Sequence, residues 1–232
     1  MIGHDAIAID GPSGAGKSTL ARAAAADYGF IYVDTGAIYR TVGLAAYRSA
    51  VDRRDGSAVA ALLPGLKIEM KYSAEGEQRM YLNGEDVSSE IRSPEVSICA
   101  SDVAALPVVR AFLLELQRRM ARENSVIMDG RDIGTVVLPD AELKIFLTAS
   151  AQARAQRRQR ELEQKGRHVS FEEVLQDIEY RDEQDSNRAA APLRRADDAV
   201  ELDTSNIGFE ESLKRIEEII EDRLGVKKRA AV

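Results

Sequence analysis

The sequence predicts an α/β protein with a doubly wound, five-stranded parallel sheet and a small antiparallel insert. Two observations indicate this fold class. Short apolar runs alternate with helical patterns along most of the chain, which is typical of parallel strands joined by crossover helices. The chain also has 232 residues, 44% of them hydrophobic, which is enough for one such domain with small insertions.

Five short apolar runs are the candidate strands. They occupy residues 6–10, 30–33, 125–128, 143–147 and 199–203. Each is too short for a helix and is bounded by glycine or polar residues, as buried parallel strands are. The residues at the strand ends are Asp10, Asp34, Asp129 and Thr148. Because ligands of such sheets bind beyond the carboxyl ends of the strands, we expect the chemistry there.

Helical patterns separate these strands. An alanine-rich stretch at 18–27 ends just before Gly29, as expected of a helix with a glycine stop. Further helices are predicted at about 107–122, 151–165, 171–186 and 209–223. The sequence therefore supplies the crossover helices that a parallel sheet needs.

One segment, 66–87, breaks the alternation of strand and helix. Two period-two runs are joined by a polar turn at 73–77, and an Asn83-Gly84 pair follows the second run. This pattern predicts a small antiparallel sheet inserted into the α/β core.

The segment after the first strand fits the phosphate-binding pattern G-x-x-x-x-G-K-[ST] in full. Its residues are Gly11, Pro12, Ser13, Gly14, Ala15, Gly16, Lys17 and Ser18, and Thr19 follows. The glycines let backbone N–H groups surround a phosphate at the positive end of the next helix. Lys17 is expected near the β- and γ-phosphates, and the Ser18 hydroxyl can coordinate Mg²⁺. The sequence therefore predicts a P-loop fold that binds a nucleoside triphosphate with Mg²⁺.

Composition argues against several other classes of protein. The single Cys99 cannot form an internal disulfide, so the fold does not depend on an oxidising compartment. No signal peptide is expected, and no apolar run approaches the roughly 20 residues that span a bilayer. The net charge of −7 argues against passive binding to nucleic acid. We therefore expect a cytoplasmic protein with no membrane or nucleic-acid partner, whose basic tail Lys227-Lys228-Arg229 is a solvated end.

Charged residues follow the second and third strands. Thr35, after Asp34, could cap a helix in which Arg40 lies about one turn further on. The run Asp129-Gly130-Arg131-Asp132 places carboxylates on both sides of an arginine whose planar fork suits a phosphate. The first of these carboxylates could hold Mg²⁺ or a water in its shell, and the second could accept a hydrogen bond from an amine. A plain salt-bridged turn is the alternative.

Arginines dominate the segment 148–195, the candidate lid, in which Lys165 is the only lysine. Two sets share a helical face at spacings of three and four residues, namely Arg154 with Arg157 and Arg158, and Arg181 with Asp185 and Arg188. The preference for arginine favours bidentate contacts with phosphate, although ion-paired surface helices show similar spacings. The segment is therefore a candidate for closing over bound phosphates.

The P-loop alone leaves several functions open. The base-reading N-K-x-D of GTPases is absent after the fifth strand, where Thr204-Ser205-Asn206 stands. Motor and transport ATPases are usually longer. Two alternatives remain at this point: a kinase of another small acceptor, such as a different nucleotide or shikimate, and a nucleotide switch or assembly protein that recruits partners.

Taken together, these motifs resemble those of bacterial-type cytidylate kinases, in the nucleoside monophosphate kinase family. The matching stretches are 9–18, 34–40, 84–87 with 91–92, 129–136 and 188–193. The stretch 129–136 and the insert are more specific than the P-loop. The resemblance implies one kinase domain with a core at about 1–35, 95–147 and 196–232, an acceptor-binding segment at about 36–94 and a lid at about 148–195.

The resemblance also implies in-line transfer of the γ-phosphoryl group of ATP to CMP or dCMP, with Mg²⁺, by a monomer. By the same resemblance, the cytosine edge is read by Ser101, Arg110 and Asp132. The sugar is contacted by Thr35, Arg181 and Asp185. The acceptor phosphate is held by Arg40, Arg131 and Arg188, and Asp129 also belongs to the CMP site. Arg154 and Arg158 would approach the donor phosphates on lid closure. The residues expected to act in catalysis are Lys17, Arg131, Arg154, Arg158, Arg181 and Arg188.

Overall fold

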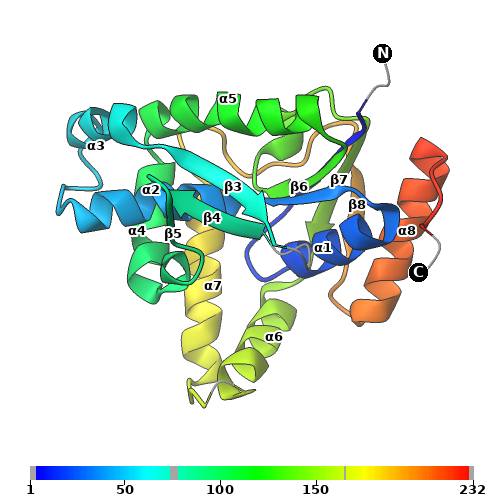
Figure 1. The fold of residues 1–232 in the computed structure, drawn as a ribbon. Helices are drawn as coiled ribbons and strands as arrows, with labels where there is room; N and C mark the ends of the chain where they lie inside the picture. The colour runs from blue at the N-terminus through cyan, green and yellow to red at the C-terminus, as the bar shows by residue number, and fades with distance from the viewer. Residues whose placement is uncertain (1–3, 74–77, 165, 230–232) are drawn as a thin grey trace. The chain divides into compact units, whose positions relative to one another are not determined.

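The computed structural model describes residues 4–73, 78–164 and 166–229. The chain forms two compact units, shown with the chain coloured by residue number in Figure 1. The first unit comprises Met1–Tyr32 and Glu123–Val232, and the second comprises Val33–Arg122.

A five-stranded sheet organises the first unit. Its strand order is β2-β6-β1-β7-β8, with β2 at Ile31–Asp34, β6 at Val126–Gly130, β1 at Ala6–Asp10, β7 at Leu143–Thr148 and β8 at Val200–Asp203. The recorded pairings of β1 with β6 and β7, and of β7 with β8, are all parallel. This confirms the predicted α/β fold, and the expected strands differ from the observed ones only at their ends.

Two helices cover one face of this sheet. They are α1 at Lys17–Tyr28 and α8 at Phe209–Leu224, which pack on apolar side chains of β1 and β7. All of β1 is buried, which explains why it appears in the sequence as a continuous apolar run. The glycine stop predicted for the first helix is confirmed, because Gly29 adopts a left-handed conformation at the end of α1.

The predicted lid segment contains two helices that pack on each other, α6 at Ala151–Gln164 and α7 at Phe171–Ser186. They share a small apolar cluster made by Ala155, Leu162, Val174 and Ile178. A capping box between Ser170 and Glu173 fixes the start of α7. Lys165, where the first of these helices was expected to end, lies outside the described residues.

The second unit contains the predicted antiparallel insert. Its strands are β3 at Ile68–Tyr72, β4 at Gln78–Leu82 and β5 at Glu85–Asp86, in that order. Both recorded pairings are antiparallel, which confirms the prediction, while residues 74–77 of the expected turn lie outside the described part. The helical elements are α2 at Thr35–Arg48, α3 at Gly56–Leu62, η1 at Leu63–Gly65, η2 at Glu90–Arg92, α4 at Pro94–Ala104 and α5 at Pro107–Glu123.

The basic residues at 227–229 are exposed, as expected of a solvated end, but they also contact the rest of the fold. The Lys228 ammonium lies 2.6 Å from the Glu217 carboxylate and 3.6 Å from that of Asp27. The backbone N–H of Arg229 donates to the Asp27 carbonyl over 2.8 Å. The tail is therefore tied to α8 and to the end of α1, because acidic partners were available there that the sequence did not reveal.

No single helix in the described ranges is both long and apolar enough to cross a membrane. The helices α4 and α5 reach the length and apolar composition of a membrane span only when they are counted together, and the chain bends by 98° between them.

Close contact between α2 and α4 yields a stability prediction. A Cβ at Gly43 would lie 2.7 Å from the backbone nitrogen of Ala100 and 2.9 Å from its Cα. The backbone cannot rotate away as a side chain can, so Gly43→Ala should lower the free energy of unfolding by about 1–3 kcal/mol. That loss outweighs the gain in helix propensity of up to about 1 kcal/mol.

Urea unfolding followed by circular dichroism measures this change. The control is Gly65→Ala in the same unit, where a Cβ would have no neighbour within 4 Å. That variant should stay within about 0.5 kcal/mol of the parent chain. Equal stability of the two variants would contradict the packing argument.

Candidate active site

The P-loop connects β1 to α1 in a conformation that only glycine permits at its first residue. Gly11 has a φ of 150°, and a Cβ there would lie 1.9 Å from the carbonyl oxygen of Leu147 on β7. Gly16, with a φ of 92°, precedes the first residue of α1. The loop therefore turns closely over the sheet and directs the N-terminus of a helix at the space where a phosphate would bind.

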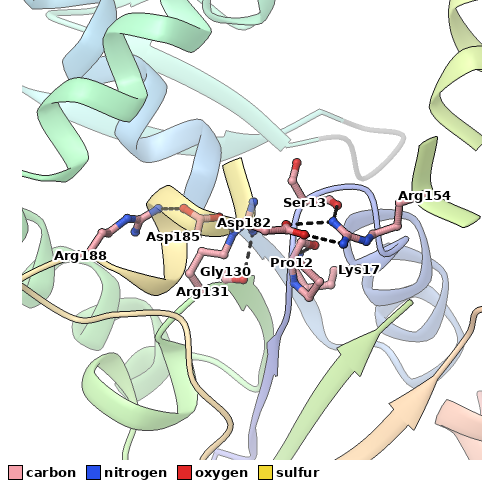
Figure 2. Close-up of polar contacts among 9 residues, drawn as sticks. All are labelled: Pro12, Ser13, Lys17, Gly130, Arg131, Arg154, Asp182, Asp185 and Arg188. Carbon is pink, nitrogen blue, oxygen red and sulfur yellow. Dashed lines mark hydrogen bonds and ion pairs between the residues drawn. The ribbon is translucent and has the colours of Figure 1, made fainter. Parts of the chain in front are cut away.

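Lys17 lies within this loop and is almost fully buried. Its Nζ donates to the carbonyl of Pro12 over 2.8 Å, so the ammonium folds back onto the loop (Figure 2). Burial, followed by the neighbouring Arg131 guanidinium, lowers the pKa of Lys17 to about 7, against the opposing effects of Asp129 and Asp10. A bound phosphate would favour the charged form again.

Ser18 and Asp129 are joined by a hydrogen bond beside the P-loop. The Ser18 hydroxyl donates to Asp129 Oδ2 over 2.7 Å, and the Tyr32 hydroxyl donates to Oδ1 over 3.0 Å. Asp129 is buried at the end of β6. A hydroxyl and a carboxylate are the hard oxygen donors that Mg²⁺ prefers, so these two residues fit the metal that accompanies ATP.

Asp10, at the end of β1, anchors the segment that carries Asp132. Its Oδ1 accepts from the N–H of Ile133 over 2.8 Å, and its Oδ2 from the N–H of Gly134 over 2.7 Å. These N–H groups open η3, a single π-helical turn at Ile133–Val137. One carboxylate thus joins the residue before the P-loop to the turn after Asp132, which is itself buried.

Two arginines share the carboxylate of Asp185, which projects from α7 (Figure 2). Arg131 Nε donates to Asp185 Oδ2 over 2.6 Å, and Arg188 donates to Oδ1. Burial would raise the pKa of Asp185, but the two guanidiniums outweigh it and hold that pKa below its ordinary value. The structure thus brings together three predicted site residues, and Asp185 orients both arginines.

The other lid arginines occupy different positions. Arg154 is buried and hydrogen-bonded to the P-loop carbonyl of Ser13 over 3.0 Å. Arg157 donates to the carbonyl of Thr204. Arg158 is exposed and pairs with Glu161 over 3.1 Å, and Arg181 is exposed on α7. Of the predicted lid arginines, Arg154 therefore contacts the P-loop, whereas Arg158 pairs with a residue of its own helix.

In the second unit, Asp34 and not Thr35 caps α2, so the expected cap is corrected. Asp34 Oδ1 accepts from the N–H of Ala37 over 2.9 Å, while Thr35 is the buried first residue of the helix. Asp34 Oδ2 also accepts from Arg40 Nη2 over 2.9 Å. Arg40 Nε is buried without a hydrogen-bond partner within the described ranges, so this guanidinium keeps a donor that an anion could take.

Arg110 and Ser101 lie on neighbouring helices of the second unit. The Arg110 guanidinium lies 5.5 Å from the centre of the Tyr39 ring, and its Nη1 donates to the Ala104 carbonyl over 3.3 Å. Ser101 is exposed on α4. The aromatic contact supports the guanidinium from one side.

Sequence reasoning missed two residues of the site. Tyr32 belongs to an apolar strand pattern, and only the structure shows its hydroxyl on Asp129. Asp182 is one acidic residue among many on α7, and it forms a bidentate pair with Arg154. Its spacing of three residues from Asp185 places both carboxylates on one face of α7, the one sequence feature that could have indicated it.

Comparison with known proteins finds the same family by a family model and by individual relatives. The family model described as cytidylate kinase matches residues 7–222. A cytidylate kinase of Lactobacillus johnsonii is 49% identical over 217 residues, covering 94% of each chain. A cytidylate kinase of Geobacter sulfurreducens is 50% identical over 217 residues, covering 94% of this chain and 93% of the relative.

The buried carboxyl of Asp10 should make stability depend on pH. Burial raises its pKa to about 6 although two backbone N–H groups oppose the shift. The folded chain therefore holds this proton over a pH range in which the unfolded chain has lost it. Relative to Asp10→Asn, the free energy of unfolding should fall as pH rises from about 4 to about 6, by roughly 3 kcal/mol in total, and then level off.

Chemical unfolding of both chains at half-unit pH steps measures that difference. The asparagine variant supplies the control, because it carries every other titrating group. A constant difference between the chains across this range would show that the two N–H donors keep the carboxyl ionised.

Proposed function

This chain belongs to the cytidylate kinase family, and we propose on that premise that it transfers the γ-phosphoryl group of ATP to CMP or dCMP, yielding CDP or dCDP. The observation that carries the proposal is the family match along 7–222 combined with a complete P-loop. The arginines on Asp185 support it further, because a transferase needs a second phosphate site that an ATPase does not.

On the donor side, we assign the phosphates of ATP to Gly11–Thr19 with Lys17, Arg154 and Arg158. Ser18, and Asp129 through a water, would hold the Mg²⁺ that neutralises charge on the β- and γ-phosphates. Their 2.7 Å hydrogen bond supports this assignment. The loop N–H groups and Lys17 align the triphosphate, which is the main requirement of a loose phosphoryl-transfer transition state.

On the acceptor side, we assign the phosphate of CMP to Arg131 and Arg188, with Asp185 and Arg181 toward the sugar and Asp132 toward the cytosine 4-amine. The same proposal assigns Thr35, Arg40, Ser101 and Arg110 of the second unit to CMP. The acceptor phosphate is already anionic near neutral pH, so the reaction needs no general base. The chain's residues have only to align it and neutralise charge.

The proposal includes the functional division given by the resemblance, with 36–94 binding the acceptor and 148–195 acting as a lid. Lid closure would exclude water, since an open P-loop site tends to hydrolyse ATP. It also includes a monomer that acts in the cytoplasm on free nucleotides.

A panel of acceptors tests the activity. ADP formation from ATP and Mg²⁺ is measured with CMP, dCMP, UMP, AMP and GMP separately, and with no acceptor. We expect fast turnover with CMP and dCMP and much slower turnover with UMP. Turnover that does not depend on any acceptor, or none at all, would instead favour a nucleotide-switch protein.

Asp132→Asn should reduce the preference for CMP over UMP. Cytosine offers an amine donor where uracil has an acceptor, and an amide binds that amine without the charge assistance of a carboxylate. The ratio of kcat/KM for CMP to that for UMP should fall by about tenfold or more. Asp140→Asn, at an exposed position further along the same connection to β7, is the matched control. Unchanged selectivity in Asp132→Asn would refute the base-reading role.

A further inference from the structure

The guanidinium of Arg154 is held by three parts of the first unit at once. Nε donates to the carbonyl of Ala149 over 2.8 Å, and Nη1 donates to that of Ser13 over 3.0 Å. Asp182, on α7, accepts from Nη1 over 2.9 Å and from Nη2 over 2.5 Å (Figure 2). The side chain of Arg154 is only 4% exposed.

The hydrogen-bond capacity of this guanidinium is nearly used up. A guanidinium has five N–H donors, and the four bonds above leave one donor, on Nη2, without a partner among the described residues. The two backbone carbonyls carry no net charge, so Asp182 is the residue that neutralises the buried cation. A buried cation without its counter-ion is strongly disfavoured, and a flexible arginine would then turn toward water.

Arg154 also packs on the P-loop itself. A Cβ at Gly14 would lie 3.4 Å from the Cβ of Arg154 and 3.8 Å from its Cγ. The stem of the arginine therefore lies along the loop, and its head is bound to the Ser13 carbonyl. If the Arg154 guanidinium moved, the N–H groups available to the phosphates of ATP on this side of the P-loop would change.

We propose that Asp182 is a positioning residue for the donor side of the reaction. From α7 it fixes the Arg154 guanidinium on the P-loop, so that the α6–α7 pair and the loop are joined through one arginine. The remaining N–H of Arg154 is then available to a donor phosphate. The inference rests on the proposed function, because it concerns the site assigned to ATP.

Steady-state kinetics of Asp182→Asn tests the inference. Asparagine keeps the size of the side chain but removes the charge that holds Arg154. The value of kcat/KM for ATP should fall by about tenfold to a hundredfold, whereas KM for CMP at saturating ATP should stay within about twofold. Asp182→Glu should restore part of the loss. Asp177→Asn, exposed on the same helix, is the matched control and should behave as the parent chain does.

A double-mutant cycle separates positioning from a general loss of structure. In an Arg154→Lys background, which lacks the planar fork, Asp182→Asn should add little further loss. The proposal would be overturned if Asp182→Asn lowered kcat/KM for ATP by the same factor in both backgrounds, or did not lower it at all. A rise in KM for CMP as large as the effect on ATP would also overturn it. If Asp182→Asn does not fold, as judged by circular dichroism, Asp182→Glu with and without Arg154→Lys serves for the same comparison.

Binding of a non-hydrolysable ATP analogue with Mg²⁺ keeps this test independent of the acceptor. Calorimetry should show a Kd about tenfold higher for Asp182→Asn than for the parent chain, a difference of about 1.4 kcal/mol. If the parent chain does not phosphorylate CMP but this difference appears, the proposed function fails and the role of Asp182 stands. An unchanged Kd in a chain that does phosphorylate CMP removes the role of Asp182 alone.

Discussion

Repulsion among cations at the carboxyl edge of the sheet is the constraint that shapes the site in the first unit. Lys17, Arg131 and Arg154 are wholly or largely withdrawn from water, where like charges interact more strongly than at the surface. Carboxylates offset this repulsion, above all Asp185, which pairs with Arg131, and Asp182, which pairs with Arg154. Within the described part of the chain, the Lys17 ammonium donates to the neutral carbonyl of Pro12, and burial together with the nearby Arg131 guanidinium lowers its pKa to about 7.

Backbone geometry explains how the carboxylates reach these positions. Asp10 is the last residue of β1 and Asp129 the last but one of the adjacent parallel strand β6. Asp10 accepts hydrogen bonds from two N–H groups of η3, and Asp129 accepts from two hydroxyls. The close approach of Gly11 to Leu147 keeps the P-loop low over the sheet. The site is thus built on the strand ends, with Arg154 added from α6 and Asp182 and Asp185 added from α7.

Much of this arrangement could be predicted from the sequence, because it depends on local patterns. Apolar runs predicted the strands, the glycine and lysine spacing predicted the P-loop, and helical patterns predicted α6 and α7. Long-range pairing could not be predicted in the same way. Nothing local distinguishes Asp182 from its acidic neighbours on α7, or shows that Lys228 finds Glu217. Asp34 caps α2 because the helix begins at Thr35, and a cap at Thr35 would have required it to begin one residue later.

The shared carboxylate of Asp185 has a consequence for which anions can bind to Arg131 and Arg188. Each oxygen of Asp185 already binds one arginine, so a single small anion such as chloride or sulfate gains little by replacing a partner that is fixed in place. In the proposed acceptor site, a nucleotide phosphate attached to a sugar and a base would bring other contacts that offset the exchange. An internal counter-ion of this kind therefore makes binding selective, because a ligand must form several contacts at once, and negative charge alone is not enough.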